Sequence, residues 1–465
     1  MKLNFKAWEY TQDDKFLEAR YSFEGDSNSG WNIQRNEMDY LQLGKGYNLF
    51  KSKFCGICST DIARRFLPFP LPQITGHEIV AESMDGKTQY VVEINDTDQA
   101  RGTVEDIFCS SGIPTHSPTR LVLGIDRLPG GFGPYFLAPI HAAIPFQSKD
   151  LDPKVAVLIE PFAACLQAVT SSPPRNGDRV AVLGPRRLGN LLIAALSCYR
   201  NIYKIDFEIV SIARHDELLQ ISKKLGADTL LRSDSLKLER QFDIVYDTTS
   251  TESGFLLALE LAKRELHLKT TNGKEMSGMK KLTELVVDEL TILPMNEKNL
   301  EFHWNDAHYK NEKIYISPKL NYILKDNAHF FQTSISEAEQ VLQSDEFANR
   351  LPRFDLAIVQ SLEEIDACIR PNSENENSLV RPRGAIILQN PNSENPIEKF
   401  LNQGGEIHSS RCGDFHLALD LLSKNPNVAK SLIENLITHT FKVKDMNEAF
   451  TIAKSPDAVK VIIEH

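Results

Sequence analysis

Three side chains that bind transition metals stand far apart along the chain. Cys58 lies in the segment GICSTD, His77 in TGHE and Glu160 in LIEP. A thiolate, an imidazole and a carboxylate supply three ligands for Zn²⁺ and leave a fourth position for water or substrate, which is typical of a catalytic rather than a structural zinc site. Zinc in such a site lowers the pKa of a bound alcohol, so that hydride leaves the carbon once the oxygen carries negative charge.

Each of these residues also has a plainer interpretation. A lone cysteine in a strand is more often a small buried apolar residue than a ligand. An acid before proline, as at Glu160, is usually a helix N-terminal residue favoured by the helix dipole. The nearby Cys55 fits the plainer interpretation, as the first residue of a strand that points into the core. The order of the segments therefore matters more than any single residue.

That order resembles a known family. GICSTD is followed by GHE, GGFGPY, EPFAACLQAV and GDRVAVLG. The succession is similar to that of the medium-chain zinc-dependent alcohol dehydrogenases, in particular their polyol and threonine dehydrogenase branches, over about residues 45–295 and 405–465. The resemblance implies an α/β protein with a β-rich GroES-like catalytic domain over 1–165, completed by 432–465. It also implies a doubly wound parallel-sheet (Rossmann) cofactor domain over 166–431, with an insertion at about 295–405.

The same resemblance assigns roles around the candidate metal. The ligands that it implies are Cys58 (rather than Cys55), His77 and Glu160. Glu78 is then a neighbour that approaches or exchanges onto the metal in some family members. Asp61 resembles the acid that orients the ligands from outside the coordination sphere, where hydrogen bonds fix ligand geometry. Thr60 occupies the position of the hydroxyl that takes the substrate proton.

A second group of residues follows the strand RVAVLG, in the loop GPRRLG at 184–189. A dinucleotide fingerprint has glycine at its first, third and sixth positions, the third so that backbone amides approach the pyrophosphate. Here the third position is Arg186. Two outcomes stay open, because the guanidinium either crowds the pyrophosphate and abolishes binding or swings outward and pairs with a phosphate. The cofactor contacts implied by the resemblance are Gly184, Arg186, Leu188, Gly189, Arg214 and Thr249.

The end of the next strand bears on the choice of cofactor. NAD-binding folds place an acid there to hold the ribose hydroxyls, whereas this chain has Ala213 followed by Arg214. With no carboxylate to repel a 2′-phosphate and an arginine to attract it, NADP is favoured over NAD. The alternative, weighted evenly, is that Arg214 is a solvated residue at the start of a helix.

Two departures from the family pattern change the expected chemistry. Many relatives hold a structural zinc with four cysteines on a lobe after GHE, but FCSSGIPTHSPTRLVLG contains only Cys109, and His116 does not complete a set. We therefore expect one catalytic zinc, no structural zinc, and a lobe held by packing. The family often has a proton-relaying histidine two positions after the orienting acid, where this chain has Ala63. Proton release would then need water or another group.

The elements that must position these residues change character along the chain. The first 150 residues read as short strands interrupted by glycine and proline, which predicts an irregular β-rich domain. After Glu160, PFAACLQAVTSS is helical in pattern, and RVAVLG is an apolar strand followed by the helix LGNLLIAALSCYR. FEIVSIA, HDELLQISKKLGAD with a stop at Gly226, and QFDIVYDTTS continue the alternation. Strands alternating with helices predict a parallel sheet covered on both faces.

A polar stretch beginning near residue 295, NEKNLEFHWNDAHYKNEKIY, interrupts this alternation, which returns near RFDLAIVQSLEEIDA. We interpret the stretch as an insertion that caps the cleft, mediates oligomerisation or does neither. QFDIVYDTTSTESGFLLALEL before ELHLKTTNG resembles RFDLAIVQSLEEIDACI before GAIILQNPN, which favours a weak internal repeat, although two buried strands around a helix also look alike by chance. The tail predicts a strand, a helix and a strand that return to the first domain.

Composition excludes several classes. At 465 residues with 42% hydrophobic and 25% charged residues, the chain is ordinary globular protein, long enough for two domains. A net charge of −11 repels nucleic acid, and no window approaches the roughly 20 apolar residues that cross a membrane. The seven scattered cysteines and the charged N-terminus favour a cytoplasmic location.

The sequence thus predicts an alcohol or polyol dehydrogenase that uses NADP, with Zn²⁺ as Lewis acid and a small-molecule alcohol or carbonyl as substrate. A non-catalytic descendant of the fold, acting as a binding or scaffold protein, is the alternative favoured by Arg186, Ala63 and the insertion. A zinc-free reductase of enones or quinones is a third hypothesis, against which the three ligands count. Family members are commonly homo-oligomers, dimers or tetramers, and the sequence does not decide the number.

Overall fold

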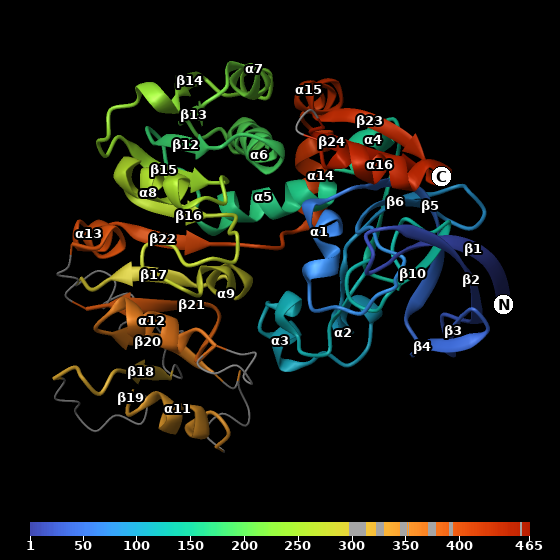
Figure 1. The fold of residues 1–465 in the computed structure, drawn as a ribbon, viewed down its shortest axis with the longest axis horizontal. Helices are drawn as coiled ribbons and strands as arrows, with labels where there is room; N and C mark the ends of the chain where they lie inside the picture. The colour runs from blue at the N-terminus through green and yellow to red at the C-terminus, as the bar shows by residue number, and fades with distance from the viewer. Residues whose placement is uncertain are drawn as a thin grey trace. The chain divides into compact units, whose positions relative to one another are not determined.

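The chain folds into two compact units and passes from one to the other twice. The structure is a computed structural model that describes residues 1–296, 313–321, 330–344, 351, 353–370, 378–389, 394–455 and 458–465. Unit 1 comprises Met1–Leu166 and Cys412–His465, and unit 2 comprises Gln167–Arg411. Figure 1 colours the first crossing in green and the second in red-orange.

Unit 1 is built on β-strands, as the sequence predicts. Its strands are β1 (Lys2–Tyr10), β2 (Phe16–Asp26), β3 (Gly30–Arg35), β4 (Met38–Leu43), β5 (Tyr47–Gly56), β6 (Glu78–Glu82), β7 (Gln89–Val92), β8 (Asn95–Asp96), β9 (Leu121–Val122), β10 (Tyr135–Pro139), β11 (Ala143–Phe146), β23 (Ile437–Lys442) and β24 (Lys460–Glu464). Its helices are α1 (Ser59–Ile62), α2 (Asp98–Arg101), α3 (Ile107–Ser110), α4 (Pro153–Ala156), α14 (Phe415–Ser423), α15 (Pro426–Leu436) and α16 (Met446–Ala453), and α5 (Ile159–Ser171) begins here.

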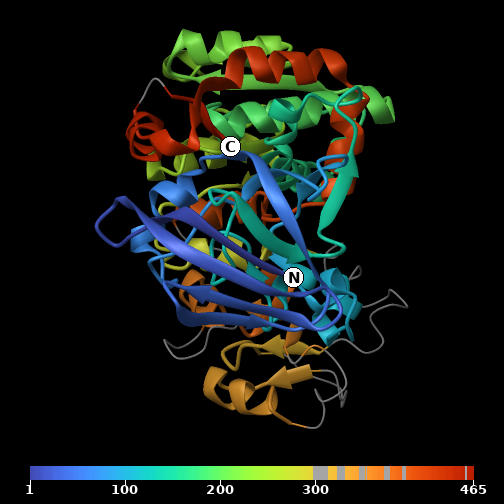
Figure 2. The same ribbon diagram turned by 90° about the vertical axis from the view of Figure 1, so that its right-hand side faces the viewer.

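Two sheets form most of this unit. Strands β1 to β4 make an antiparallel meander, drawn in dark blue in Figure 2. The second sheet has the order β11-β7-β6-β5-β24-β23, with β10 also paired to β5. The C-terminal strand β24 thus lies beside β5, which agrees with the expected return of the tail. The sequence placed this return at residue 432, whereas unit 1 resumes at Cys412, because α15 packs on α4 and β23.

Unit 2 contains a sheet with helices along it. Its strands are β12 (Arg179–Leu183), β13 (Glu208–Ala213), β14 (Thr229–Arg232), β15 (Phe242–Asp247), β16 (Ala262–Leu268), β17 (Thr291–Pro294), β18 (Ile314–Ile316), β19 (Phe330–Gln332), β20 (Phe354–Val359), β21 (Val380–Leu388) and β22 (Glu406–Ser409). Its helices are α6 (Arg187–Tyr203), α7 (Asp216–Lys224), α8 (Glu252–Leu261), α9 (Leu282–Val287), α11 (Ile335–Val341), α12 (Leu362–Cys368) and α13 (Pro396–Asn402).

These strands join in the order β14-β13-β12-β15-β16-β22-β17-β21-β20-β18-β19. The described strand pairs of the sheet are parallel except for β17 and β22. The central strands are buried along nearly their whole length, as expected when helices cover both faces of a parallel sheet. Helix α7 ends where predicted, because Gly226 after it has a φ of +113°.

The two segments compared as a weak internal repeat contain the strands β15 and β20, which share one local feature. Each begins with Phe-Asp, and each aspartate accepts a hydrogen bond from the backbone beside the neighbouring strand: Asp243 from Arg179 N and Asp355 from Lys313 N, both at 2.8 Å. In Figures 1 and 2 the described strands β18 and β19 lie at the opposite end of unit 2 from β13 and β14. The described part of the insertion therefore extends the sheet. The polar stretch from residue 297 to 312 lies outside the described residues.

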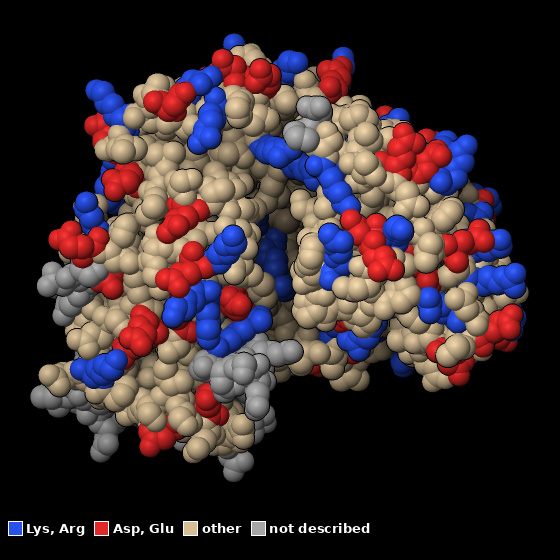
Figure 3. Space-filling model, in the orientation of Figure 1, with Lys and Arg blue, Asp and Glu red and all other residues tan. Residues whose placement is uncertain are grey.

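The surface carries charged side chains of both signs. On the face shown in Figure 3, acidic and basic side chains are interspersed among the other residues. No helix in the described ranges is long and apolar enough to cross a membrane.

Candidate active site

The register of β5 and β6 brings the first two candidate ligands together. These strands are antiparallel, and Gly56 at the end of β5 pairs with Glu78 at the start of β6. Cys58 follows this pair by two residues, as the N-cap of α1, and His77 precedes it by one. Both side chains therefore leave the same end of the sheet. Glu160 belongs to the same unit, in the first turn of α5.

Asp61 ties the two segments to each other. Its Oδ2 atom accepts a hydrogen bond from the backbone N of Cys58 at 2.9 Å, and its Oδ1 atom accepts one from Gly76 N at 3.2 Å. The imidazole of His77 has its Nδ1 atom 3.5 Å from Asp61 Oδ1. Asp61 is only 1% exposed. One buried carboxylate thus fixes the backbone beside both candidate ligands and faces the imidazole ring.

The electrostatics of the site favour bound positive charge. Burial lowers the pKa of His77, but the nearby carboxylate of Asp61 and the contact with Cys58 outweigh it and raise the pKa well above its ordinary value. Burial raises the pKa of Glu160 to about 7, a shift opposed by His77 and increased by Glu78. Both groups therefore tend to hold a proton. For Glu160 the main cause is burial, whereas for His77 it is the carboxylate of Asp61.

Cys58 and Glu160 are partly exposed, whereas His77 and Glu78 are buried. The Cys58 thiol contacts the hydroxyl of Thr60 at 3.8 Å. Among the described residues, no hydrogen-bond partner reaches His77 Nδ1 or Glu78 Oε1. Buried polar atoms without partners are uncommon in native proteins and mark sites of strain, chemistry or missing ions.

The donor set of sulfur, nitrogen and carboxylate oxygen matches the chemistry of zinc. In the described part of the chain, however, no three Cys, His, Asp or Glu side chains converge closely enough to form a complete set of metal ligands. Cys58 and His77 lie together, and Glu160 stands within electrostatic reach of His77. The structure thus gathers two of the three predicted ligands and places the third nearby.

Sequence reasoning missed one charged residue of this site. Lys460, at the start of β24, forms an ion pair with Glu78, and its side chain is 7% exposed. The pairing of β24 with β5 brings it there across 382 residues of sequence, since Ile462 pairs with Gly56. Only the alternation of AVKVIIE, with a lysine among apolar residues, marks Lys460 as unusual in the sequence.

The second candidate site is a cavity of about 480 Å³ in unit 2. It lies where β12, β13 and β15 end, and β13 and β15 flank β12 on opposite sides. Open α/β sheets bind ligands at such a point, because the connections run to opposite faces and leave a crevice. The predicted residues in its lining are Gly184, Arg186, Arg214 and Thr249.

Leu188 and Gly189, also predicted to bind cofactor, do not line this cavity. They stand in the first turns of α6, where Gly189 allows close packing, since a Cβ atom on it would lie 2.9 Å from Gly184 O. Arg186 is the N-cap of α6, and its backbone N donates to Gly184 O at 2.7 Å. Its side chain lines the cavity.

Several lining residues were not identified from the sequence. His215, Ser233, Asp234 and Gly254 also border the cavity. His215 directly follows Arg214, and both are exposed at the end of β13. The carboxylate of Asp234 forms an ion pair with Arg232 at 2.7 Å.

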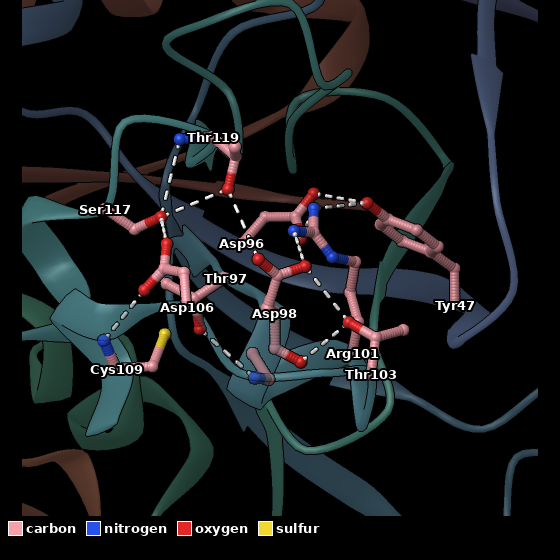
Figure 4. A network of polar contacts seen from close by, with 11 residues as sticks. Tyr47, Asp96, Thr97, Asp98, Arg101, Thr103, Asp106, Cys109, Ser117 and Thr119 are labelled. Carbon is pink, nitrogen blue, oxygen red and sulfur yellow. Dashed lines mark hydrogen bonds and ion pairs between the residues drawn. The ribbon is translucent and has the colours of Figure 1, made fainter. Parts of the chain in front are cut away.

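The lobe that was expected to be held by packing contains a polar network, shown in Figure 4. Asp106 caps α3 by accepting from Cys109 N at 2.8 Å, and it also accepts a hydrogen bond from Ser117. Ser117 contacts the Thr119 hydroxyl at 3.1 Å, which in turn donates to Asp98 at 3.4 Å. Packing alone was therefore an incomplete prediction, because hydroxyl groups and carboxylates connect the ends of the lobe.

Most of the known proteins that resemble this chain are named as dehydrogenases. No family model matches the chain. It is 30% identical over 199 residues to the starvation-sensing protein RspB of Escherichia coli, covering 41% of this chain and 57% of that protein. It is 30% identical over 210 residues to an alcohol dehydrogenase of Geobacillus stearothermophilus, covering 42% and 58%. The chain spans about half the length of these curated relatives. A (R,R)-butanediol dehydrogenase of Bacillus subtilis is 25% identical, covering 61% of this chain and 82% of that protein.

Solved structures establish the fold. L-idonate 5-dehydrogenase of Escherichia coli superposes with a TM-score of 0.59 at 14% identity, covering 100% of this chain and 99% of that one. An alcohol dehydrogenase (rspB) of Escherichia coli in complex with NADH gives 0.58 at 16% identity, covering 99% of both chains. A zinc-binding dehydrogenase of Sinorhizobium meliloti bound to NADP gives 0.55 at 14% identity, also covering 99% of both.

Proposed function

Because the chain is a divergent member of the medium-chain alcohol dehydrogenase superfamily, we propose that it is an oxidoreductase that transfers hydride between an alcohol or polyol, or the matching carbonyl compound, and a nicotinamide cofactor. The observation that carries the proposal is the joint placement of Cys58, His77 and Asp61 at one end of the β5–β6 pair. The cavity at the ends of β12, β13 and β15 supports the cofactor half of the proposal.

We propose that Cys58, His77 and Glu160 hold one Zn²⁺, which when bound supplies Lewis-acid polarisation of the substrate oxygen. Support comes from the raised pKa values of His77 and Glu160, since groups that favour protons in a negative site also favour a cation. Cys58 and His77 lie together, and Glu160 is close enough for the charge of His77 to act on its pKa. Asp61 then keeps the His77 ring oriented, and the partly exposed Cys58 and Glu160 leave the site accessible to substrate.

Thr60 is the proposed first proton acceptor. Its hydroxyl contacts Cys58 and is partly exposed, so it can pass a proton from the substrate toward solvent. Ala63, in place of a relaying histidine, leaves water to complete the transfer. This arrangement lowers the rate of proton release without removing the route.

We propose NADP as the cofactor. Arg214 and His215 stand together at the end of β13, where a 2′-phosphate would lie in a fold of this kind. Gly184 and Thr249 border the crevice, and Arg186 at the start of α6 would pair with the pyrophosphate. The free state of all seven cysteines supports a cytoplasmic location for such an enzyme.

The central experiment measures bound metal in purified protein beside two cysteine variants. We expect one zinc per chain in the natural protein and in Cys412→Ser, a control that removes another partly exposed cysteine of unit 1. Cys58→Ser should lose the zinc. Equal zinc in all three proteins would contradict the proposed site. NADPH fluorescence is followed in the same samples, and an unchanged emission spectrum on mixing would contradict the cofactor proposal.

A binding or scaffold protein is the second candidate, favoured by Arg186 in the fingerprint and by Ala63. The two measurements separate it from the enzyme. A scaffold shows neither zinc nor a response to NADPH, whereas a zinc-free reductase responds to NADPH and contains no zinc.

A further inference from the structure

Asn190 is a fully buried polar residue in the first turn of α6, which follows the loop of the dinucleotide fingerprint. Its Nδ2 atom donates a hydrogen bond to the backbone oxygen of Pro185 at 2.6 Å. Its Oδ1 atom accepts one from the hydroxyl of Ser222 in α7 at 2.9 Å, and Ser222 accepts one from Ser211 in β13 at 2.9 Å. A chain of hydrogen bonds therefore runs from β13 through α7 and α6 to this loop.

The partners of Asn190 fix which way its amide faces. A backbone carbonyl accepts and cannot donate, so the amide nitrogen must face Pro185 O. Ser211 donates to the oxygen of Ser222, which leaves the Ser222 proton for Asn190 Oδ1. Buried polar groups are costly unless they are hydrogen-bonded. The asparagine is tolerated in this buried position because both ends of its amide are bonded.

The backbone N–H groups of the loop are bonded within the protein. Gly184 N donates to Ile212 O at 3.0 Å, and Pro185 has no N–H. Arg186 N donates to Gly184 O at 2.7 Å. The carbonyl of Pro185 and the N–H of Arg186 belong to one planar peptide unit. Asn190 therefore holds one end of that unit, and Gly184 holds the other.

This arrangement changes how the loop can recognise an anion. In the usual fingerprint, glycine at the third position lets backbone amides approach the pyrophosphate. Here the third position is Arg186, whose N–H is bonded and whose side chain lines the cavity at the ends of β12, β13 and β15. A guanidinium offers both charge and paired N–H donors to a phosphate. Recognition at this point of the loop thus falls to the side chain, and the start of that side chain depends on the peptide unit that Asn190 holds.

We infer that Asn190 is a positioning residue for phosphate recognition, whose amide fixes the peptide unit before Arg186 so that the guanidinium lines the cavity. The inference rests on the proposed function, because it takes this cavity to be the dinucleotide site. It deepens that function by naming the part of the cofactor involved, the pyrophosphate, which NADPH and NADH share. It therefore predicts equal losses for both cofactors, unlike a change at the 2′-phosphate.

The test replaces Asn190 with leucine, which has a similar size and no hydrogen-bonding group, and titrates the full-length protein with NADPH and with NADH by fluorescence. Ser222 keeps a partner in this variant, since its hydroxyl also donates to Leu218 O at 3.0 Å. Asn190→Leu should weaken both cofactors about three- to tenfold, because at most the contact of arginine with phosphate is lost. The ratio of the two Kd values should stay within about twofold of that of the natural protein.

A double-mutant cycle with Arg186→Gly tests whether Asn190 acts through the arginine. In the Arg186→Gly protein, adding Asn190→Leu should change either Kd by less than about twofold, since the guanidinium is already absent. Losses that simply add would show that Asn190 supports the fold near the cavity without directing Arg186, and they would contradict the inference.

Ile193→Val is the matched control, because it removes one methyl group from a fully buried residue of the same helix. It should lower the free energy of unfolding in urea and leave both Kd values unchanged. Weaker cofactor binding in Ile193→Val would mean that any loss of packing in α6 disturbs the cavity, which contradicts a specific role for the amide.

The outcomes separate the inference from the function on which it rests. A natural protein that binds neither cofactor contradicts both. A natural protein that binds them while Asn190→Leu binds equally well contradicts the positioning role alone, as does a loss confined to NADPH. If Asn190→Leu fails to fold, Asn190→Ala removes the amide without added bulk and should give the same equal loss.

Discussion

The cofactor preference of the cavity should depend on Arg214. Arg214 is exposed at the end of β13, so its attraction for a 2′-phosphate acts through a medium close to water. At about 4 Å in water, two unit charges attract by about 1 kcal/mol, and a phosphate monoester carries about −1.5 to −2 charges. Arg214→Ala should therefore cost about 1.5 to 2 kcal/mol of NADPH binding, or about 10- to 30-fold in Kd.

NADH lacks the 2′-phosphate, so its Kd should change by less than about twofold in Arg214→Ala. Lys223→Ala is the matched control, because it removes one exposed positive charge from the last turn of α7 in the same unit. Fluorescence titrations of both cofactors at low and physiological salt measure these effects, and salt should reduce the difference for NADPH. Equal losses of NADPH and NADH affinity in Arg214→Ala would show that the arginine does not recognise the phosphate.

Three further predictions concern other charged groups. Arg186→Gly should weaken NADPH binding about tenfold if the guanidinium pairs with a phosphate, and fluorescence titration showing tighter binding would indicate crowding instead. Asp61→Asn should lower Co²⁺ affinity about 10- to 100-fold, measured by absorbance titration against a chelator. Burial disfavours the charged form of Glu265, but His408, His267 and Ser172 outweigh it and lower its pKa to about 2. Because this pKa lies below the ordinary value, the ionised carboxylate stabilises the folded protein by about 3 kcal/mol at neutral pH. This stabilisation is lost as the pH falls from about 5 to about 2. The free energy of unfolding in urea should lack that part of its pH dependence in Glu265→Gln.

Local patterns in the sequence predicted unit 2 well up to residue 294. Runs such as RVAVL and EIVSIA are buried on both faces, and continuous apolar strands followed by amphipathic helices have few alternative folds. The contact of Asp61 with the backbone of Cys58 could also be expected from the sequence. Asp61 stands three residues after Cys58, which is the spacing of a capping box. Contacts of this kind depend on neighbours in sequence, so spacing is enough to anticipate them.

The N-terminal meander was not identified as long strands. Strand β1 alternates exposed and buried residues only weakly, since lysine and glutamate stand among its aromatic residues. Asn36 and Glu37 form the turn between β3 and β4, and both adopt positive φ. Two such residues between strands are typical of a tight hairpin.

For Cys55, the sequence predicted burial correctly and the position within the strand wrongly. Its side chain is fully buried, as expected of a small apolar residue. It is not the first residue of its strand, since β5 begins at Tyr47 and Cys55 is the next to last residue. Burial follows from residue type, whereas the start of β5 depends on its pairing with β6, β10 and β24, which the sequence of β5 does not encode.

The described part of the insertion adds strands to the unit 2 sheet and can be compared with its first half. In the first half, Thr251 caps α8, and Gly254 three residues later borders the cavity. In the second half, Ser361 caps α12 in the same way, and the residue three positions later is Glu364. Its carboxylate accepts hydrogen bonds from the Ser317 hydroxyl and the backbone N of residue 360, both at 2.8 Å.

The two positions that follow the caps by three residues carry different side chains. At position 254 only glycine fits, because an added Cβ would lie 2.0 Å from Thr249 Oγ1. At position 364, glutamate satisfies the polar groups that a ligand would otherwise meet. These groups end β18 and begin α12, as Gly184 and Thr251 do for β12 and α8. The described part of the insertion therefore lengthens the sheet.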